Sequence, residues 1–358
     1  MENKHTIGDL RQMQSLPLQA KIQMTRQRIR GWIDEFGEDG VYVSFSGGKD
    51  STVLLDIARK DYPDIEAVFV NTGLEYPSVR QFALSKENVT ELRPTMNFRD
   101  VIIKYGYPII GKQFCKKLTE TRRGSKIALR NFTGEMKGSL YDYSRYSFVL
   151  NAPFNVSHKC CDVMKKDPCK EIKSLPIFGS MAEESTNRLK SWCQNGCNAF
   201  ESDHPKSNPM SFWTGNDVLT YIHTYNLSIA DAYGQIVVKN DGIDGQINIH
   251  DYLGDYRDCQ YETTGCKRTG CIFCGFGITQ DKQRFARLSE QEPKLCDYVM
   301  RGGEFNKNGM WQPSKDGLGY WFVLEWLNVH GNLRIGIPNR EYYLSEYQTE
   351  ETRKHLAN

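Results

Sequence analysis

The sequence has no long apolar run and no excess of charge of either sign. No stretch of its 358 residues approaches the roughly 18 consecutive apolar residues that a membrane-spanning helix requires. No apolar segment of the signal-peptide type follows the first methionine, so we expect a cytoplasmic protein without a membrane partner. The 46 Lys and Arg balance 44 Asp and Glu to a formal charge of +2. The net charge therefore does not indicate a nucleic-acid-binding protein, although local basic segments can still bind a nucleic acid.

Two common phosphate-binding motifs are also absent. A Walker loop requires a glycine five positions before Gly48, where Val43 stands, and a Ser or Thr after the lysine, where Asp50 stands. A dinucleotide fingerprint requires three spaced glycines, whereas this segment has only the adjacent pair Gly47 and Gly48. The sequence therefore excludes both the Walker loop and the dinucleotide fingerprint here.

The segment 41–58 is predicted to form a strand, a loop and a helix. β-Branched and aromatic residues over 41–45 favour a buried strand, and apolar residues over 53–58 recur with helical spacing. The loop between them is Ser46, Gly47, Gly48, Lys49, Asp50 and Ser51. It presents backbone N–H groups, hydroxyls and a lysine at a helix N-terminus. These groups favour an anion such as phosphate or sulfate.

Strands and helices alternate along much of the chain. Further strands are expected at 65–70, 88–92 and 175–181, and helices at 17–36 and 98–105. This alternation predicts an α/β fold with a doubly wound parallel sheet, whose ligands bind at the carboxyl ends of the strands.

We expect three segments along the chain. Residues 1–36 would form a helical N-terminal extension, and residues 281–358 a C-terminal extension. Residues 37–280 would form the phosphate-loop domain, which also contains the paired cysteines. The aromatic residues after position 300 suggest a small packed cap or an interface.

Eleven cysteines favour a metal or redox site over a disulfide framework. Cys160 and Cys161 are adjacent, and Cys271 and Cys274 form a C-x-x-C motif. Thiolates ligate zinc and iron–sulfur clusters, and C-x-x-C places two sulfurs on one ion or one cluster. Cys266 extends this motif to a spacing that plant-type two-iron ferredoxins also use. Spacing alone therefore leaves the kind of metal centre open.

A basic segment lies between the expected third and fourth strands. Its charged residues are Lys112, Lys116, Lys117, Glu120, Arg122, Arg123, Lys126 and Arg130. Such a segment either binds a nucleotide or a nucleic-acid backbone, or is a solvent-exposed insert. The composition leaves both interpretations open.

Two further motifs, together with the loop and the cysteines, resemble a known family. They are Gly179–Arg188, similar to G-x-R-x-x-E-S-x-x-R, and Asn208–Val218, similar to P-L-x-x-W-t-x-x-D-V. Over roughly residues 35–280 the chain resembles the phosphoadenosine phosphosulfate (PAPS) reductase family. This family belongs to the PP-loop ATP pyrophosphatase, or adenine nucleotide alpha hydrolase-like, superfamily.

The resemblance implies a PP-loop fold, a nucleotide held by residues Ser46 to Ser51, and a metal centre. In adenylyl-sulfate reductases a Cys-Cys pair and a later C-x-x-C hold a [4Fe-4S] cluster. These ligands map onto Cys160, Cys161, Cys271 and Cys274.

Three departures from the family pattern bear on function. Sulfonucleotide reductases carry a nucleophilic cysteine near the C-terminus, whereas the last cysteine here is Cys296. Their phosphate loop is usually degenerate, whereas this loop is intact. Met181 replaces the first arginine of the G-x-R motif, which weakens the case for a second anionic group there, while Arg188 is retained.

The intact loop therefore predicts an enzyme that cleaves ATP to AMP and pyrophosphate and adenylates an acceptor for sulfur transfer. It would resemble tRNA-thiolating enzymes and the ATP pyrophosphatase of DNA phosphorothioation systems. Asp50 would act through Mg²⁺ or the loop, and Arg188 would stabilise charge on the reacting phosphate. Expected partners are an adenine nucleotide, a sulfur donor or reductant protein, and an acceptor that is a nucleic acid in one alternative.

Two other functions stay open. A PAPS or adenylyl-sulfate reductase would release sulfite, with Cys266, Cys197 or Cys296 as its thiol. A non-catalytic nucleotide-binding partner would use the basic segment to dock a larger complex. Nucleotide turnover separates this partner from both enzymes, and nucleotide choice separates the two enzymes from each other.

Overall fold

A computed structural model describes residues 3–239 and 259–357 of the chain. The chain divides into two compact units, each built from segments that alternate along the sequence. Unit 1 comprises residues 1–71, 75–93 and 169–270, and unit 2 comprises residues 72–74, 94–168 and 271–358. The boundaries expected after residues 36 and 280 stay a prediction.

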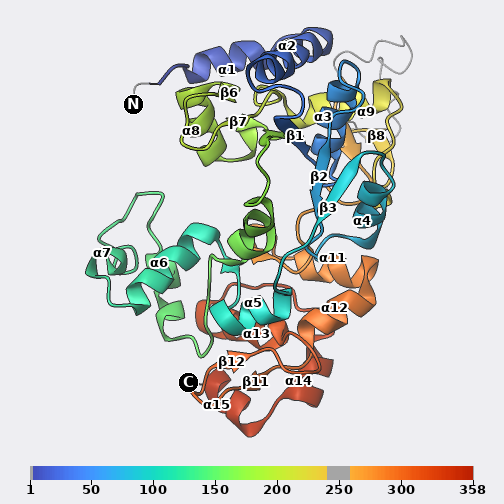
Figure 1. Cartoon of the computed structure of the whole chain (residues 1–358). Helices are drawn as coiled ribbons and strands as arrows, with labels where there is room; N and C mark the ends of the chain where they lie inside the picture. Colours follow the sequence, from blue (N-terminus) through green and yellow to red (C-terminus); the bar gives the residue numbers. More distant parts are fainter. Residues whose placement is uncertain (1–2, 240–258, 358) are drawn as a thin grey trace. The chain divides into compact units, whose positions relative to one another are not determined.

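Unit 1 is built on a six-stranded sheet with the order β3-β2-β1-β5-β7-β6. The strands are β1 (Val41–Ser44), β2 (Ala67–Val70), β3 (Val89–Leu92), β5 (Leu175–Phe178), β6 (Asn198–Ala199) and β7 (Lys206–Ser207). All neighbouring pairs are parallel except β6 with β7 (Figure 1). The predicted α/β fold with a mostly parallel sheet is therefore confirmed.

The strand order reverses at β1. From β1 the chain continues to β2 and β3 on one side, and β5 pairs with β1 on the other. In doubly wound sheets a ligand binds beyond the carboxyl ends of the strands at such a reversal. The loop that follows β1 therefore occupies the position where this fold binds its ligand.

Amphipathic helices pack on the sheet of unit 1. They are α1 (Ile7–Gln14), α2 (Leu18–Phe36), α3 (Lys49–Arg59), α4 (Pro77–Leu84), α8 (Thr186–Asn195) and α9 (Gly215–Thr224), and a short hairpin pairs β8 (Ile236–Val238) with β9 (Tyr261–Thr263). In α2 the buried side chains include Ile22, Ile29, Trp32 and Ile33. Their spacing agrees with the predicted apolar face.

Several local features of unit 1 follow from the residue types at the helix starts and in the core. Pro77 lies in the first turn of α4, where its missing N–H costs nothing. Thr214 and Asp217 form a capping box at the start of α9. Trp213 is fully buried and donates its Nε1–H to Thr25 Oγ1 at 2.9 Å, so it is a core residue.

Unit 2 is largely helical. Its elements are α5 (Phe98–Tyr105), β4 (Ile109–Ile110), α6 (Lys112–Arg122), α7 (Lys126–Leu129), β10 (Gly275–Phe276), α11 (Arg284–Gln291), α12 (Pro293–Met300), β11 (Glu304–Phe305), β12 (Trp311–Gln312), α13 (Tyr320–Gly331), α14 (Arg340–Tyr347) and α15 (Glu350–Ala357). Every residue from 320 to 327 is buried, so α13 is the core helix of this unit. In neither unit does the described chain contain a helix long and apolar enough to cross a membrane.

A largely buried ion pair of unit 1 joins α2 to α9. Lys21, only 2% exposed, donates from Nζ to both carboxylate oxygens of Asp217 at 2.7 and 2.8 Å. Replacing Lys21 by Met would leave this carboxylate largely buried without its counter-ion. We expect Lys21→Met to lower the free energy of unfolding by roughly 3 kcal/mol, as measured by urea denaturation.

The matched control is Arg93→Met. Arg93 pairs with Glu91, but its side chain is 65% exposed, so its loss should cost less than about 1 kcal/mol. Equal losses for the two variants would contradict the assignment of Lys21 as a structural ion-pair partner.

Candidate functional site

The loop between β1 and α3 is a tight turn that depends on Gly47. The φ angle of this residue, +69°, lies in the left-handed region. A Cβ built there would stand 2.8 Å from the carbonyl oxygen of Val79. Only glycine meets both conditions without strain. The turn makes Gly48 the N-cap of α3, so the loop amides gather at a helix N-terminus.

Two serine hydroxyls hold this loop in shape. The Ser46 N–H donates to Ser51 Oγ at 3.2 Å, and the two hydroxyl oxygens are 3.0 Å apart. Ser51 Oγ also donates to the Gly48 carbonyl at 3.0 Å, and the Gly48 N–H donates to Ser46 Oγ at 3.3 Å. The two predicted binding serines therefore also serve as the internal support of the loop.

Two residues that sequence reasoning missed also line the loop. The Tyr233 hydroxyl accepts the Lys49 N–H at 3.0 Å and lies 2.7 Å from Thr269 Oγ1. Burial raises the pKa of Tyr233 to about 12, so the hydroxyl is protonated at neutral pH and can donate a hydrogen bond. An anion bound at the helix N-terminus would compete with Tyr233 for the Lys49 amide. No motif marks either residue, because each lies far from the loop in sequence.

The predicted catalytic charges belong to the same site. Lys49 Nζ lies 2.6 Å from Asp50 Oδ1. Arg188, at the start of α8, pairs with Glu184, which also accepts Arg268 Nη2 at 3.1 Å. Burial and the neighbouring Arg268 lower the pKa of Arg188, and the Asp50 carboxylate opposes this effect. Asp50 and Arg188 are therefore within electrostatic reach of each other.

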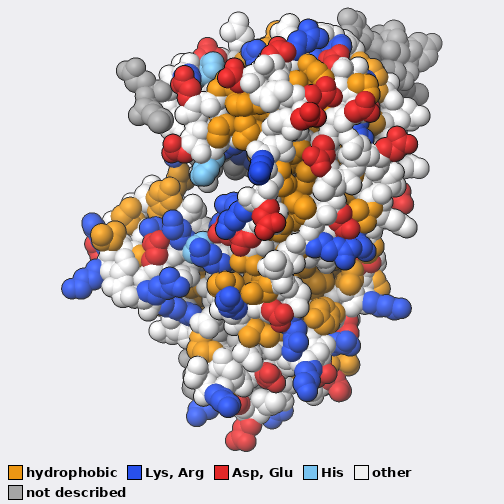
Figure 2. Space-filling view, viewed as in Figure 1, with side chains coloured by type: hydrophobic (Ala, Val, Ile, Leu, Met, Phe, Trp, Pro, Cys, Tyr) orange, Lys and Arg blue, Asp and Glu red, His pale blue; other side chains and the backbone are white. Residues whose placement is uncertain are grey.

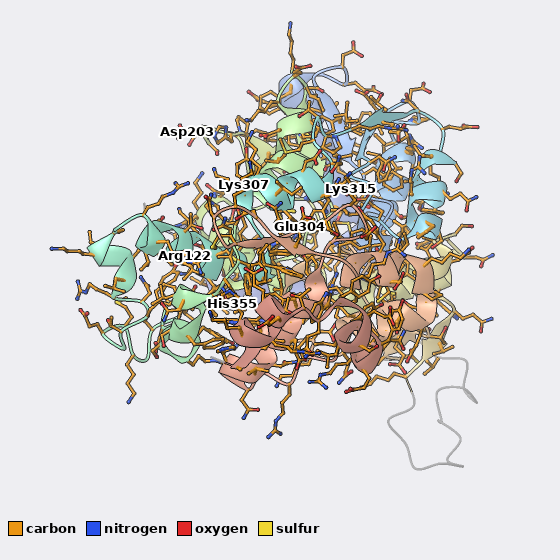
Figure 3. The ribbon with its side chains drawn as sticks, turned by 90° about the horizontal axis from the view of Figure 1, so that it is seen from below. Arg122, Asp203, Glu304, Lys307, Lys315 and His355 are labelled. Atoms are coloured by element: carbon orange, nitrogen blue, oxygen red, sulfur yellow. The ribbon has the colours of Figure 1, made fainter. Side chains whose placement is uncertain are left out.

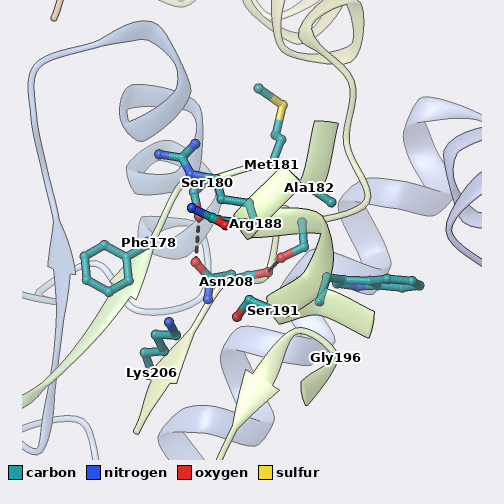
Figure 4. A pocket seen from close by; sticks show the side chains of 12 residues that line it. Phe178, Ser180, Met181, Ala182, Arg188, Ser191, Gly196, Lys206 and Asn208 are labelled. Carbon is teal, nitrogen blue, oxygen red and sulfur yellow. Dashed lines mark hydrogen bonds between the residues drawn. The ribbon is translucent and has the colours of Figure 1, made fainter. Parts of the chain in front are cut away.

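A cavity of about 340 Å³ lies at the carboxyl end of β5 and is lined by Phe178, Ser180 and Arg188, among others. Its polar lining includes Arg188 and Lys206, and Ser180 Oγ donates to Asn208 Oδ1 at 2.6 Å (Figure 4). Gly179 packs so closely on the start of α3 that a Cβ would stand 2.9 Å from the Asp50 carbonyl oxygen. Met181 lines the cavity where the family motif has an arginine. The cavity nevertheless presents two cations to an anionic ligand.

The four predicted cysteine ligands all belong to unit 2. Cys160 and Cys161 directly precede the helical turn Asp162–Lys166. Cys271 and Cys274 lie in a turn closed by a Cys274 N–H to Cys271 O bond of 3.1 Å, directly before β10. β10 pairs in parallel with β4.

The thiols of these two pairs influence one another. Burial raises the pKa of Cys160, and Cys161, Cys271 and Cys274 raise it further. Burial and the neighbouring Cys271 raise the pKa of Cys274 to about 11. Yet over residues 3–239 and 259–357 no group of three or more Cys, His, Asp or Glu side chains has the spacing of a metal site.

The three thiols considered for a reductase differ in environment. Cys197 and Cys296 are buried, and burial raises the pKa of both, that of Cys296 to about 12. Such thiols are poor nucleophiles. Cys266 is partly exposed and belongs to unit 1, where its backbone N–H donates to the carbonyl of Ala232, the residue before Tyr233, at 2.8 Å. Among the three, only Cys266 combines exposure with a place beside the loop.

The basic segment is less available than its composition indicates. Arg122 projects from α6 (Figure 3) and donates to the carbonyls of Phe154, Val149 and Ala152, which makes it a structural residue. Lys112, Lys117 and Arg130 pair with Asp162, Glu120 and Glu135. Lys116, Arg123 and Lys126 are exposed. Figure 2 shows mixed basic, acidic and apolar side chains over α6 and α7.

Comparison with known proteins identifies the family. The sequence profile of the phosphoadenosine phosphosulfate reductase domain matches residues 40–275. Because this match spans more than half of the chain, the chain belongs to the PAPS reductase family. The predicted family is therefore confirmed.

Curated relatives are distant. Adenosine 5'-phosphosulfate reductases of Geobacillus thermodenitrificans and Geobacillus kaustophilus are 23% and 25% identical over 54% of this chain and 66% of theirs. An uncharacterized protein of Methanocaldococcus jannaschii is 33% identical over 82 residues, which are 22% of this chain and 20% of that protein. The chain thus spans less than two thirds of the length of each of these relatives.

A solved structure was also compared with the chain. The phosphate complex of the PAPS reductase from Candida auris is 14% identical, with a TM-score of 0.33, over 64% of this chain and 92% of that one. A TM-score this low adds nothing to the fold assignment, which stands on the sheet topology.

The geometry of Gly47 generates a stability prediction. Gly47→Ala adds both left-handed strain and the clash with the Val79 carbonyl. Gly37 has a similar φ of +77° but open space around a built Cβ, so Gly37→Ala isolates the strain, which costs about 1–2 kcal/mol. We expect Gly47→Ala to lower the free energy of unfolding by clearly more than Gly37→Ala in urea denaturation. Indistinguishable losses would show that the loop relaxes around the added methyl group.

Proposed function

We propose that the chain is a nucleotide-dependent sulfur-transfer enzyme that cleaves ATP to AMP and pyrophosphate and adenylates an acceptor. The observation that carries this proposal is the ordered loop at the reversal of the strand order, with Lys49, Asp50 and Arg188 gathered around it. Membership of a family named for sulfonucleotide chemistry supports the assignment of an adenine nucleotide.

The proposed reaction has two steps. An acceptor oxygen attacks the α phosphorus of ATP, the bond to the bridging oxygen breaks, and pyrophosphate leaves with that electron pair. A sulfur nucleophile then forms a bond to the acceptor atom that carries the oxygen, and AMP leaves. Adenylation is needed because a bare oxygen is a poor leaving group, whereas AMP is a good one.

The residues of the loop take separate roles in the proposal. The amides at the start of α3 and the Lys49 ammonium would hold the phosphates. Asp50 would bind Mg²⁺, which would neutralise phosphate charge. Lys49 now pairs with Asp50, so a metal at this carboxylate would release the ammonium for the nucleotide. Arg188 would stabilise the charge that develops on the reacting phosphate.

The cysteines of unit 2 fit an iron–sulfur cluster by the chemistry of their donors. All four lie in one unit, and the Cys160 thiol is influenced electrostatically by the other three. A cluster of several irons keeps its thiolates farther apart than a single ion does, so the absence of single-metal spacing among the described residues is compatible with it. A [4Fe-4S] cluster held by Cys160, Cys161, Cys271 and Cys274 would bind or relay sulfur. Binding of this cluster is part of the proposed function.

The acceptor and the sulfur source are proposed by class only. A nucleic acid is one acceptor, which Lys116, Arg123 and Lys126 on the exposed side of the basic segment would contact through its phosphates. A separate protein would deliver sulfur or electrons. Because several of the seven basic residues already have partners within the protein, we expect weaker binding of phosphates than the composition of the segment alone indicates.

The second candidate function is a PAPS or adenylyl-sulfate reductase. The observation that favours it is Cys266, a partly exposed thiol on the same side of unit 1 as Tyr233 and the loop. In this mechanism the thiolate attacks the sulfur of the sulfonucleotide and the adenylyl phosphate leaves. A reductant thiol then releases sulfite from the enzyme.

One anaerobic assay separates the candidates. We expect Mg·ATP, offered with acceptor RNA or DNA fragments and a sulfide source, to yield AMP and pyrophosphate in equal amounts. Adenylyl sulfate and PAPS should yield no sulfite. Gly48→Ala should reduce ATP turnover by tenfold or more, because its Cβ would stand 3.2 Å from Ser46 Oγ and Tyr233 Oη and crowd the phosphate.

Gly31→Ala is the matched control, since a Cβ built at Gly31 meets nothing within 4 Å. Sulfite release without ATP cleavage would contradict the proposed function and favour the reductase. Nucleotide binding without turnover of any of the three nucleotides would favour a non-catalytic partner.

The proposed cluster generates a separate prediction. The anaerobically purified protein should be brown and contain about four irons per chain. Cys160→Ala, Cys161→Ala, Cys271→Ala and Cys274→Ala should each lose iron, whereas Cys266→Ala should keep it, because Cys266 is not one of the four ligands that the family resemblance implies. Iron and acid-labile sulfide analysis provides the measurement. Stoichiometric zinc without sulfide would contradict the cluster.

A further inference from the structure

Tyr320 begins the core helix α13 and lies outside the segment that matches the family profile. It is fully buried. Its ring contacts Tyr107 edge to face, with centroids 5.2 Å apart, and Phe285 at 5.7 Å. The side chain is therefore held by aromatic packing on two sides, and its hydroxyl has little freedom to move.

The Tyr320 hydroxyl has no hydrogen-bond partner within the described residues, and its oxygen is inaccessible to solvent. A buried polar group without a partner costs about 1–3 kcal/mol, so such groups are rare in folded proteins. Two other buried tyrosines of unit 2 have hydrogen-bond partners. Tyr107 donates to the Leu318 carbonyl at 2.8 Å and Tyr343 to Asp297 Oδ1 at 3.0 Å. The unpaired hydroxyl therefore indicates an acceptor that the polypeptide itself does not supply.

The packing of Tyr320 places it beside the C-x-x-C turn. Its ring contacts Phe285, and the preceding residue Arg284 donates from Nη2 to the Cys271 carbonyl. Burial raises the pKa of Tyr320 well above its usual value, and the thiols of Cys274 and Cys160 raise it further. One cysteine of each predicted ligand pair thus acts on the same hydroxyl. The group remains protonated at every physiological pH, so it can only be useful here as a donor or a weak acceptor. A sulfur of the centre that these cysteines would hold is therefore the candidate acceptor.

Arg284 gives an independent observation at the same place. Its Nη2 donates to the Cys271 carbonyl at 2.5 Å, and its buried Nε–H has no partner within the described residues. Its charge lowers the pKa of Cys274, against the effect of burial. Two unsatisfied donors from the C-terminal segment, one neutral and one cationic, therefore lie in the electrostatic neighbourhood of the cysteines. This pattern suits an acceptor that carries negative charge.

We propose that Tyr320 is a positioning residue that donates its hydroxyl hydrogen to a sulfur of the centre held by Cys160, Cys161, Cys271 and Cys274. The inference rests on the iron–sulfur cluster of the proposed function. A donor to a cluster sulfur stabilises the more negative, reduced state and therefore raises the reduction potential. The C-terminal segment would thus tune the centre as well as form the core of unit 2.

The test is Tyr320→Phe in the full chain, purified anaerobically. Phenylalanine keeps the ring contacts and removes only the hydroxyl. Only the difference in hydrogen-bond strength between the reduced and oxidised states changes the potential, and we expect this difference to favour the reduced state about tenfold. We expect the midpoint potential to fall by about 59 mV, the equivalent of tenfold. Potentiometric titration followed by electron paramagnetic resonance provides the measurement.

Tyr343→Phe is the matched control, because it removes a buried hydroxyl of the same unit that already has a partner in Asp297. It should lower the thermal unfolding temperature but leave the potential unchanged. In cluster-free protein prepared with a chelator, Tyr320→Phe should not be destabilised, since the lost hydroxyl had no protein partner. A 3-fluorotyrosine placed at 320 is a stronger donor and should shift the potential upward.

Brown protein whose potential is the same for wild type, Tyr320→Phe and the fluorotyrosine form would overturn the inference and leave the proposed cluster intact. If Tyr320→Phe fails to fold, the fluorotyrosine form alone decides, and no upward shift overturns the inference. Colourless wild-type protein would overturn the proposed cluster and the inference together.

Discussion

The left-handed turn at Gly47 is the constraint on which the candidate nucleotide site depends. A positive φ and the nearby Val79 carbonyl leave room for no side chain, so β1 can pass into α3 only through glycine. This turn directs the amides of Gly48 and Lys49 to the carboxyl edge of a parallel sheet, where the strand order reverses. The serines, the salt bridge of Lys49 with Asp50 and the Arg188 side chain then assemble around a backbone that is already fixed.

The candidate site of unit 2 depends on a different constraint, which is the burial of cysteine thiols. Thiols in an apolar environment resist ionisation, as the raised pKa values of Cys160 and Cys274 indicate. Thiolate ligands would therefore need compensation from a metal centre and from nearby donors. Tyr320 and Arg284 have unsatisfied donors in the electrostatic neighbourhood of these cysteines. We therefore interpret the C-terminal segment as support for the cysteine site as well as hydrophobic core.

Much of unit 1 could be predicted because its signals are local. The predicted strands and the helix over 17–36 agree with the structure to within three residues at each end, since apolar periodicity and glycine punctuation act over a few positions. The loop residues were found from one contiguous motif. Tyr233 was not, because its contact with Lys49 joins residues 184 positions apart, and Thr269 belongs to the site through its contact with Tyr233. The structural role of Arg122 could not be predicted either, since its carbonyl partners cannot be read from charge patterns.

The sequence by itself determined the family, the class of fold, the loop over residues 46–51 and the two cysteine pairs, because each is encoded by residues close together in the chain. Only the tertiary structure decided which side chains complete these sites. It brought Tyr233 to the Lys49 amide and placed all four cysteines in one unit. It also left the Tyr320 hydroxyl unpaired among the described residues. The physical reason is that burial and hydrogen-bond satisfaction are properties of contacts between distant segments, which periodicity and motif spacing do not record.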